Sequence, residues 1–230
     1  AHRLDRGFAG YLRWIAARPH DADVARWRDE LAGRLHPVVV APGATASSAL
    51  SEMSLDAPEL ATLAARTRAA GLRLPDVVEA AWGLAVRRMT GVDDGTDVVF
   101  GSTVSGRDAP VDGVDDAVGM FINTVPVRAP GAAATRRARD LVDGLAAHHD
   151  RVRDCLHIGL TDIARTAGRS AGELFDTLVV VEIGTGADQI DASGTGLEIV
   201  EIVNDGAPHY PLTVVITPDA PAPLRLIHDE

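Results

Sequence analysis

The sequence has 230 residues, of which 46% are hydrophobic and only 4% aromatic, so it allows one sizeable core built mainly from aliphatic side chains. The net charge is −11 and the sequence contains no lysine, which argues against a nucleic-acid partner because phosphate binding needs a basic surface. No stretch approaches the roughly 20 apolar residues that span a bilayer, and the single cysteine excludes an internal disulfide.

These features predict a protein of a reducing compartment. No charged-then-apolar leader opens the sequence, so we expect a cytoplasmic location and no membrane partner. The arginine-only, alanine-rich composition is typical of high-GC bacterial coding sequences.

The first ninety residues are mainly helical in pattern. Phe8, Tyr11 and Ile15 share one helical face, and Val24, Trp27 and Leu31 share another. Pro19, Gly71 and Gly91 mark helix ends. The spacing predicts helices over 4–17, 21–35, 56–70 and 74–89, a linker over 36–48 and a weak strand over 49–55.

The second half is richer in strands. Valine-rich runs, helical stripes and loops of Gly, Asp and Pro alternate along it. The order of helices, strands, helix and strands predicts an α/β sandwich with a mixed sheet rather than a doubly wound nucleotide fold. We expect strands over 97–104, 118–127, 178–183, 197–203, 212–217 and 224–227, helices over 135–153 and 160–167, and an acidic loop over 106–117.

A search for standard reaction motifs finds little. The pieces Gly184-Thr-Gly186 and Gly194-Thr-Gly196 lead into no helix, so they indicate flexible hairpin loops rather than phosphate cradles. The loop aspartates between 112 and 116 lack the ligand spacing of a calcium loop, and no zinc motif occurs. Cys155 follows acidic residues, so we expect a buried, unreactive thiol and no metal site.

One segment spells most of an acyltransferase motif. A predicted helix contains the sequence His148-His149-Asp150-Arg151-Val152-Arg153-Asp154. The spacing of His148, His149 and Asp154 is His-His-x-x-x-x-Asp. This is close to the His-His-x-x-x-Asp-Gly motif of the superfamily that includes chloramphenicol acetyltransferase. The motif requires a loop that presents the second imidazole to substrate, because a general base must first reach the proton. We therefore interpret the two histidines as a helix-surface pair and reject all three residues as catalytic.

The region from 97 to 128 carries a more specific pattern. Val98-Val-Phe-Gly-Ser-Thr-Val-Ser-Gly-Arg107 is followed by Val118-Gly-Met-Phe-Ile-Asn-Thr-Val-Pro-Val-Arg128. Both segments resemble condensation domains of nonribosomal peptide synthetases. Further landmarks follow the family order, namely Phe8-Ala-Gly-Tyr-Leu-Arg-Trp14, Trp27-Arg28, Leu174-Phe-Asp-Thr-Leu178 and His209-Tyr-Pro-Leu212.

The resemblance implies a chloramphenicol-acetyltransferase-like two-layer sandwich with a mixed sheet and helices on one face. Such domains have two lobes around a tunnel that admits two phosphopantetheine arms, which partner carrier proteins bring, beside an adjacent adenylation domain. The catalytic histidine motif belongs to the first lobe. By resemblance, this chain is the second, acceptor-side lobe, with opening helices over 1–35, a floor loop and following strand over 106–128, and late strands with a latch over 176–230.

The expected tunnel or lobe-interface residues follow from that placement. Glycines allow close backbone approach to a thin ligand, and small hydroxyl side chains offer hydrogen bonds without bulk. Asn123 is the residue that we most expect to contact substrate. In the alternative, which stays open, this segment is a structural strand whose polar side chains only form hydrogen bonds with buried backbone groups. The set is Gly101, Ser102, Thr103, Ser105, Gly119, Asn123, Thr124 and Arg128, with no catalytic residue and no directly bound cofactor.

Three functional classes remain open from the sequence. The first is the acceptor-side half of a condensation domain, which needs its N-terminal lobe to form peptide bonds. The second is a self-sufficient small acyltransferase that uses His149. The third is a noncatalytic docking module of the same shape.

Overall fold

The computed structural model describes residues 6–33, 35–40, 48–52, 57–131, 137–182, 209–218 and 224–229. The helices are α1 (Arg6–Ala16), α2 (His20–Glu30), α3 (Ala57–Ala69), α4 (Leu74–Thr90), α5 (Ala138–Val152), α6 (Leu160–Thr166) and α7 (Ala171–Leu174). The strands are β1 (Leu35–Pro37), β2 (Ser48–Glu52), β3 (Asp97–Val104), β4 (Asn123–Ala129), β5 (Thr177–Val181), β6 (Leu212–Ile216) and β7 (Leu224–Asp229).

The described strands form one seven-stranded mixed sheet in the order β1-β3-β5-β6-β7-β2, with β4 also paired to β3. Strand β3 is parallel to β1 and β5 and antiparallel to β4. Strands β6 and β7, and β7 and β2, are antiparallel. Strand β1 pairs with the first residues of β3, and strand β5 pairs with Gly101 and Ser102 further along β3. Strands β1 and β5 therefore follow one another along the same edge of β3.

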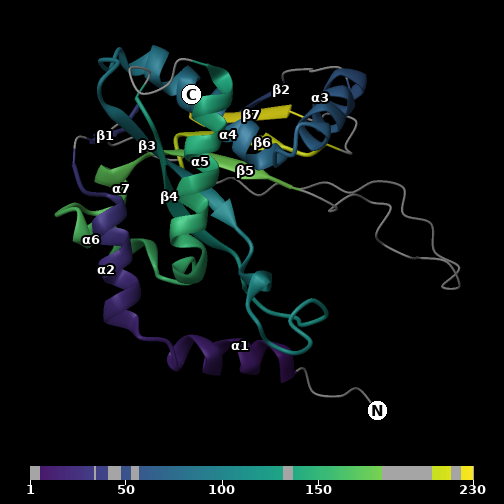
Figure 1. Cartoon of the computed structure of the whole chain (residues 1–230), viewed down its shortest axis with the longest axis vertical. Helices are drawn as coiled ribbons and strands as arrows, with labels where there is room; N and C mark the ends of the chain where they lie inside the picture. Colours follow the sequence, from purple (N-terminus) through teal and green to yellow (C-terminus); the bar gives the residue numbers. More distant parts are fainter. Residues whose placement is uncertain are drawn as a thin grey trace, which may run out of the picture.

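Helices α4 and α5 pack against the sheet and enclose the main core (Figure 1). Val98 and Phe100 alternate along β3 toward this core, and Val127 lies opposite Phe100 in the register. Leu145 of α5 is fully buried among them. The apolar side chains on one face of the strands, which recur every second residue, therefore pack against the apolar side chains of the helices, which recur about every 3.6 residues.

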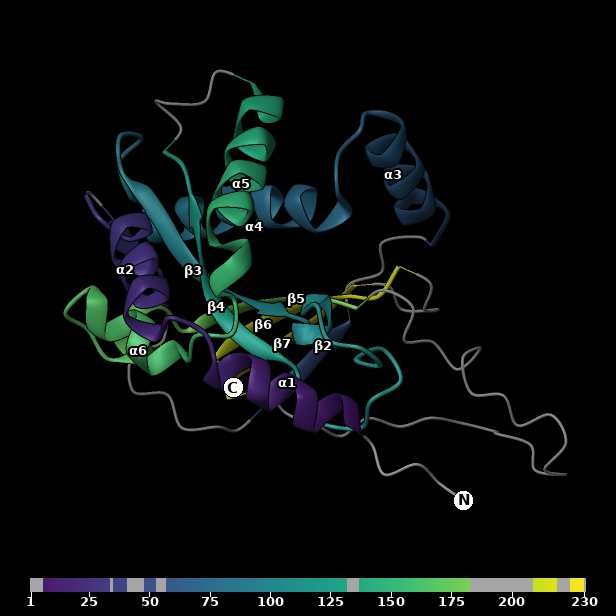
Figure 2. The same ribbon diagram turned by 60° about the horizontal axis from the view of Figure 1, so that its bottom comes forward.

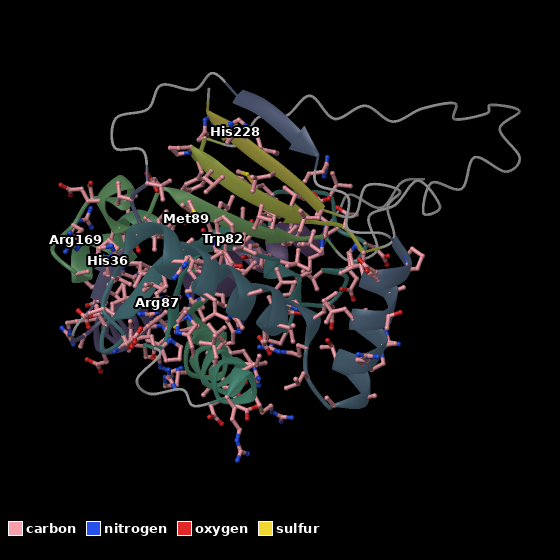
Figure 3. All side chains as sticks on the ribbon, turned by 90° about the horizontal axis from the view of Figure 1, so that it is seen from above. His36, Trp82, Arg87, Met89, Arg169 and His228 are labelled. Carbon is pink, nitrogen blue, oxygen red and sulfur yellow. The ribbon has the colours of Figure 1, made fainter. Side chains whose placement is uncertain are left out.

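Helix α4 has clear end signals. Pro75 lies in its first turn, and Gly91 ends it in a left-handed conformation with φ of 64°. Figure 3 labels Trp82, Arg87 and Met89 on this helix. The Arg87 guanidinium donates to the carbonyls of Asp93 and Pro130, which ties the end of α4 to the segments that precede β3 and follow β4, at one end of this antiparallel pair.

A second core joins α2, α6 and α7 to the strands. The Trp27 ring is fully buried there, and its Nε1 donates to the carbonyl oxygen of Cys155 at 2.9 Å. Phe175, just before β5, is also fully buried in this cluster. This core fixes the segment after α5, which the site uses below.

Helix α1 lies beside the loop after β3 (Figure 2). A cluster of aromatic and aliphatic side chains holds the two segments together. The rings of Phe8 and Tyr11 pack against Phe121, with centroids 5.3 and 4.9 Å apart. Arg107 places its guanidinium over the Phe121 ring and donates to the carbonyl oxygen of Ala117 at 3.1 Å. The acidic loop is thus organised around one arginine and one aromatic ring.

The predicted two-layer α/β architecture with a mixed sheet is confirmed, with corrections to individual elements. The strand predicted over 118–127 begins only at Asn123, because Asn123 pairs with Val104, the last residue of β3, and the residues before it face no strand. The helix predicted over 21–35 ends at Glu30, and β1 covers the last residue of that predicted helix and the first two of the predicted linker. Short helix α7 was not predicted. The strand expected over 197–203 and both Gly-Thr-Gly pieces lie outside the described residues.

No helix in the described part of the chain has the length and hydropathy of a membrane span.

Candidate functional site

A cleft of about 430 Å³ lies between α1, α4, the end of β3 and the α5–α6 segment. Its lining includes Ser102, Thr103 and Ser105 from the end of β3, together with His149 from α5. Tyr11 and Trp14 of α1 contribute the aromatic part of the lining. Three of the residues predicted for a substrate tunnel therefore share one cleft.

The β3 end supplies small polar side chains to this cleft. Ser102 is buried, Thr103 is half-buried and Ser105 is exposed, so the exposure of these residues increases along the end of β3. The Ser105 hydroxyl accepts a hydrogen bond from the backbone N–H of Arg107. Small side chains leave room for a thin ligand, and the hydroxyl groups offer it hydrogen bonds.

His149 lies in the wall of the same cleft rather than on an open helix surface. Its Nδ1 lies 2.8 Å from Oδ1 of Asp76, and its Nε2 lies 3.1 Å from Oε2 of Glu79. Burial alone would lower the pKa of His149, but the two carboxylates outweigh it and raise the pKa to about 9. His149 is therefore a cation at neutral pH, and a protonated imidazole has no lone pair with which to act as a general base.

His148 points away from the cleft into a buried ion pair. Its side chain is 1% exposed, and its Nδ1 lies 2.8 Å from Oε1 of Glu30 on α2. Arg151 donates to both oxygens of the same carboxylate, at 2.6 and 2.7 Å. Burial alone would raise the pKa of Glu30, but hydrogen bonds from Arg151 and His148 lower it to about 2. The expectation of a helix-surface histidine pair is therefore wrong, because both rings are packed against carboxylates of other helices.

Asp154 and Cys155 follow α5 in a short 3-10 turn. The Asp154 carboxylate is 66% exposed and lies 3.5 Å from Arg26. Burial raises the pKa of the Cys155 thiol to about 12, with a smaller contribution from the charge of Asp23. This thiol is buried and stays protonated, in agreement with the predicted unreactive cysteine.

His157 is a second imidazole of the cleft lining that the motif search did not identify. Its side chain is only 4% exposed, packs edge-on against Trp14 and lies 3.4 Å from Asp23. Burial holds the pKa of His157 below its usual value, so this ring is neutral at pH 7.

Asn123 braces the chain from the start of β4. Its Nδ2 donates to the carbonyl oxygens of Leu156 and Ile158 at 2.7 and 2.8 Å, and its Oδ1 accepts from the N–H of Thr124 at 2.9 Å. The Thr124 hydroxyl hydrogen-bonds to Tyr210. Both side chains lie outside the cleft lining, and Asn123 uses its amide to fix the segment that carries His157.

The two predicted glycines serve packing within the chain. A Cβ at Gly101 would overlap the ring of Phe175, and a Cβ at Gly119 would overlap the ring of Phe8. Aromatic rings of the same chain therefore fill the space that we expected a ligand arm to use.

Arg128 lies apart from the cleft, in a second and more open depression beside α2 and α5. Its Nε donates to Asp97 at 2.7 Å and its Nη1 to the carbonyl of Glu30 at 2.6 Å. The guanidinium thus joins the ends of β3, β4 and α2, which is a structural role.

Sequence reasoning also missed the acidic pair of α4. Asp76 and Glu79 are three residues apart, so they lie on one helical face, and both are 2% exposed. Two acidic residues on a buried face that also carries Val78, Ala80, Gly83 and Val86 were the available signal. Their partner, His149, lies 73 residues after Asp76 in the sequence.

Comparison with known proteins agrees with this architecture. The sequence model of the condensation domain family matches residues 7–222. The chain is 30% identical to a component of the linear gramicidin synthase of Brevibacillus parabrevis over 227 residues, which cover 95% of this chain and 3% of that protein. It is 27% identical to bacitracin synthase 3 of Bacillus licheniformis over 243 residues, or 99% of this chain and 4% of that protein.

Solved structures share the fold. The first condensation domain of the CDA synthetase has a TM-score of 0.65 at 19% identity, with 99% of this chain and 48% of that chain covered. The X-domain from teicoplanin biosynthesis has a TM-score of 0.68 at 21% identity, with 94% and 51% covered. The chain thus spans about half the length of these structures and a small part of the synthetases. By the family match over nearly its whole length, this chain belongs to the condensation domain family of nonribosomal peptide synthetases.

Proposed function

We propose that this chain is the acceptor-side half of a condensation domain, which forms an amide bond between two substrates held as phosphopantetheinyl thioesters on carrier proteins. The amine of the acceptor attacks the carbonyl carbon of the donor thioester, the C–N bond forms as the C–S bond breaks, and the amine proton leaves as the donor thiol is released. The cleft that gathers Ser102, Thr103 and Ser105 is the observation that carries this proposal.

Two further observations support a missing facing half. The chain spans 48% of the solved CDA condensation domain, so about an equal length of that structure has no counterpart here. Val118, Met120 and Ile122 are 84, 81 and 67% exposed in the segment before β4. Apolar side chains exposed together mark an interaction surface, and we assign this one to the first lobe, which would also supply the catalytic histidine.

A self-sufficient acyltransferase is the second candidate function, because His149 lines a cleft formed by this chain alone. A self-sufficient acyltransferase would need this imidazole as a base. Its raised pKa and its two carboxylate neighbours favour a fixed cation instead.

A docking module is the third candidate. The X-domain from teicoplanin biosynthesis has been solved in complex with OxyB, and it shares this fold with a TM-score of 0.68. Binding to a partner without turnover, even when the complete domain is present, would favour that class over a condensing one.

The test uses the complete domain with carrier-bound donor and acceptor, and follows the condensed product by intact-protein mass spectrometry. Thr103→Val replaces the hydroxyl of a cleft residue with a methyl group of similar size, and we expect about a tenfold loss in rate for one lost hydrogen bond. Thr166→Val, which removes an α6 hydroxyl bonded to the carbonyl of Ile163, is the matched control. Equal rates for the two variants would remove the cleft from the reaction.

A further inference from the structure

Three metal-ligand side chains meet in the wall of the cleft. Asp76 and Glu79 come from one face of α4, and His149 comes from α5, which packs against it. One ligand atom from each residue lies within 4.8 Å of the other two. The helix pair therefore brings two carboxylates and one imidazole together, with Asp76 beside Nδ1 and Glu79 beside Nε2 of His149, although α4 and α5 are far apart in the sequence.

Glu79 is held in this group by an ion pair with His149 rather than by an aligned hydrogen bond. Its side chain is 3% exposed, and its Oε2 has no hydrogen bond within the described structure. The oxygen lies 3.1 Å from His149 Nε2 without the alignment of a hydrogen bond. Ligands about 2 Å from a tetrahedral Zn²⁺ ion lie roughly 3.3 Å from each other, so this separation matches the edge of a metal site.

Burial makes a cation favourable at this oxygen. A carboxylate oxygen removed from water and left without an aligned hydrogen bond is costly, and a cation offsets that cost. In the metal-free chain that cation is the protonated His149, so a metal ion must displace the imidazole proton when it binds. All three side chains also line the cleft, so a fourth coordination position faces open space. Three protein ligands with one open position is the arrangement of reactive rather than structural zinc sites.

We propose that Asp76, Glu79 and His149 bind a divalent first-row transition-metal ion such as Zn²⁺, with its open position toward the cleft. One imidazole with two carboxylates suits Zn²⁺, Co²⁺ or Mn²⁺, whereas Ca²⁺ needs six to eight oxygen ligands. This site goes beyond the proposed condensation reaction and does not depend on it.

Arg73 is the built-in competitor of the metal ion. Its Nη2 lies 2.8 Å from Asp76 Oδ1 and 3.0 Å from His149 Nδ1. The Arg73 side chain is 54% exposed, so it can turn toward solvent when a cation takes its place. Because like charges repel, Arg73→Gln should strengthen metal binding about tenfold.

The experiment titrates the chelator-treated chain with Zn²⁺ by calorimetry and with Co²⁺ by visible absorption. We expect one ion per chain and the absorption spectrum of four-coordinate cobalt. Glu79→Gln and His149→Gln should each weaken binding at least tenfold, whereas His20→Gln, which removes an exposed histidine, should not change it.

The Arg73→Gln variant separates a metal site from a simple ion-pair cluster. Tighter binding supports the site, because a purely structural arginine would not oppose a cation. No saturable binding, or binding that Glu79→Gln and Arg73→Gln leave unchanged, would overturn the proposal. Thermal unfolding with and without Zn²⁺ keeps the test valid if His149→Gln folds poorly, since Glu79→Gln must then lose the stabilisation that the ion gives the wild type.

Discussion

His148 and His149 are neighbours in the sequence but belong to two different regions of the molecule. Successive helical residues point about 100° apart, so α5 turns one ring toward α2 and the other toward α4. On the α2 side, the carboxylate of Glu30 is shared by His148, which is buried, and by Arg151, which lies at the edge of the more open depression. The α4 side opens onto the cleft, where Asp76 and Glu79 flank His149. The same residue type therefore braces the fold on one side and forms part of a site on the other.

Removing the shared carboxylate should show the largest difference between the two sides. Glu30→Ala leaves His148 buried without its partner, so we expect a loss of about 3 kcal/mol in the free energy of unfolding. Asp76→Ala should cost about half as much, because water can reach His149 and Arg73 from the cleft. Urea unfolding of both variants measures this, and an equal loss would show that the two sides do not differ.

Acid should remove the contribution of Glu30 on the α2 side. The pKa of Glu30 is about 2 in the fold and 4.5 in its ordinary state, so its contribution is complete above pH 4.5 and disappears as the pH falls toward 2. The difference in stability between wild type and Glu30→Gln should shrink over that range. A difference that stays constant from pH 5 to about 2.5 would contradict the assigned ion pair.

Alkali should weaken the α4 side. The pKa of His149 is about 9 in the fold against an ordinary 6.5, so its contribution is complete below pH 6.5 and is lost as the pH rises through about 9. Nuclear magnetic resonance of the imidazole, with a chelator present, measures the titration directly. A midpoint near 6.5 would mean that the two carboxylates do not hold the proton.

The outward face of α5 should show the smallest effect. Arg139 and Asp143 form an i,i+4 pair at 2.8 Å, but both side chains are half exposed. Arg139→Ala should change the free energy of unfolding by no more than about 0.5 kcal/mol. A loss comparable with that of Glu30→Ala would show that burial does not set the scale of these pairs.

The fold was largely predictable because its signals are local. Val98, Phe100 and Val127 alternate as strand residues, and Pro75 and Gly91 mark the ends of α4. The start of β4 was misplaced because residues 118–122 have strand-forming side chains, whereas the length of β3 decides where pairing begins. Pairing partners far away in the sequence are not visible in a local pattern.

The site was only partly predictable for the same reason. Ser102, Thr103 and Ser105 follow one another in a short segment, so a family pattern indicated them together. Asp76, Glu79 and His149 lie together only because α4 and α5 pack against each other, and the spacing of these residues in the sequence does not predict that contact. Asn123 has the side chain of a ligand contact, but its amide is used by Leu156 and Ile158, which only coordinates reveal.

The most direct measurement is product formation by this chain alone, with donor and acceptor loaded on their carrier proteins and the acceptor analysed by intact-protein mass spectrometry. We predict no condensed product from the chain alone and a clear mass shift once the facing lobe is rejoined. Condensation by the isolated chain, lost in His149→Ala, would contradict the assignment and make His149 the reactive group.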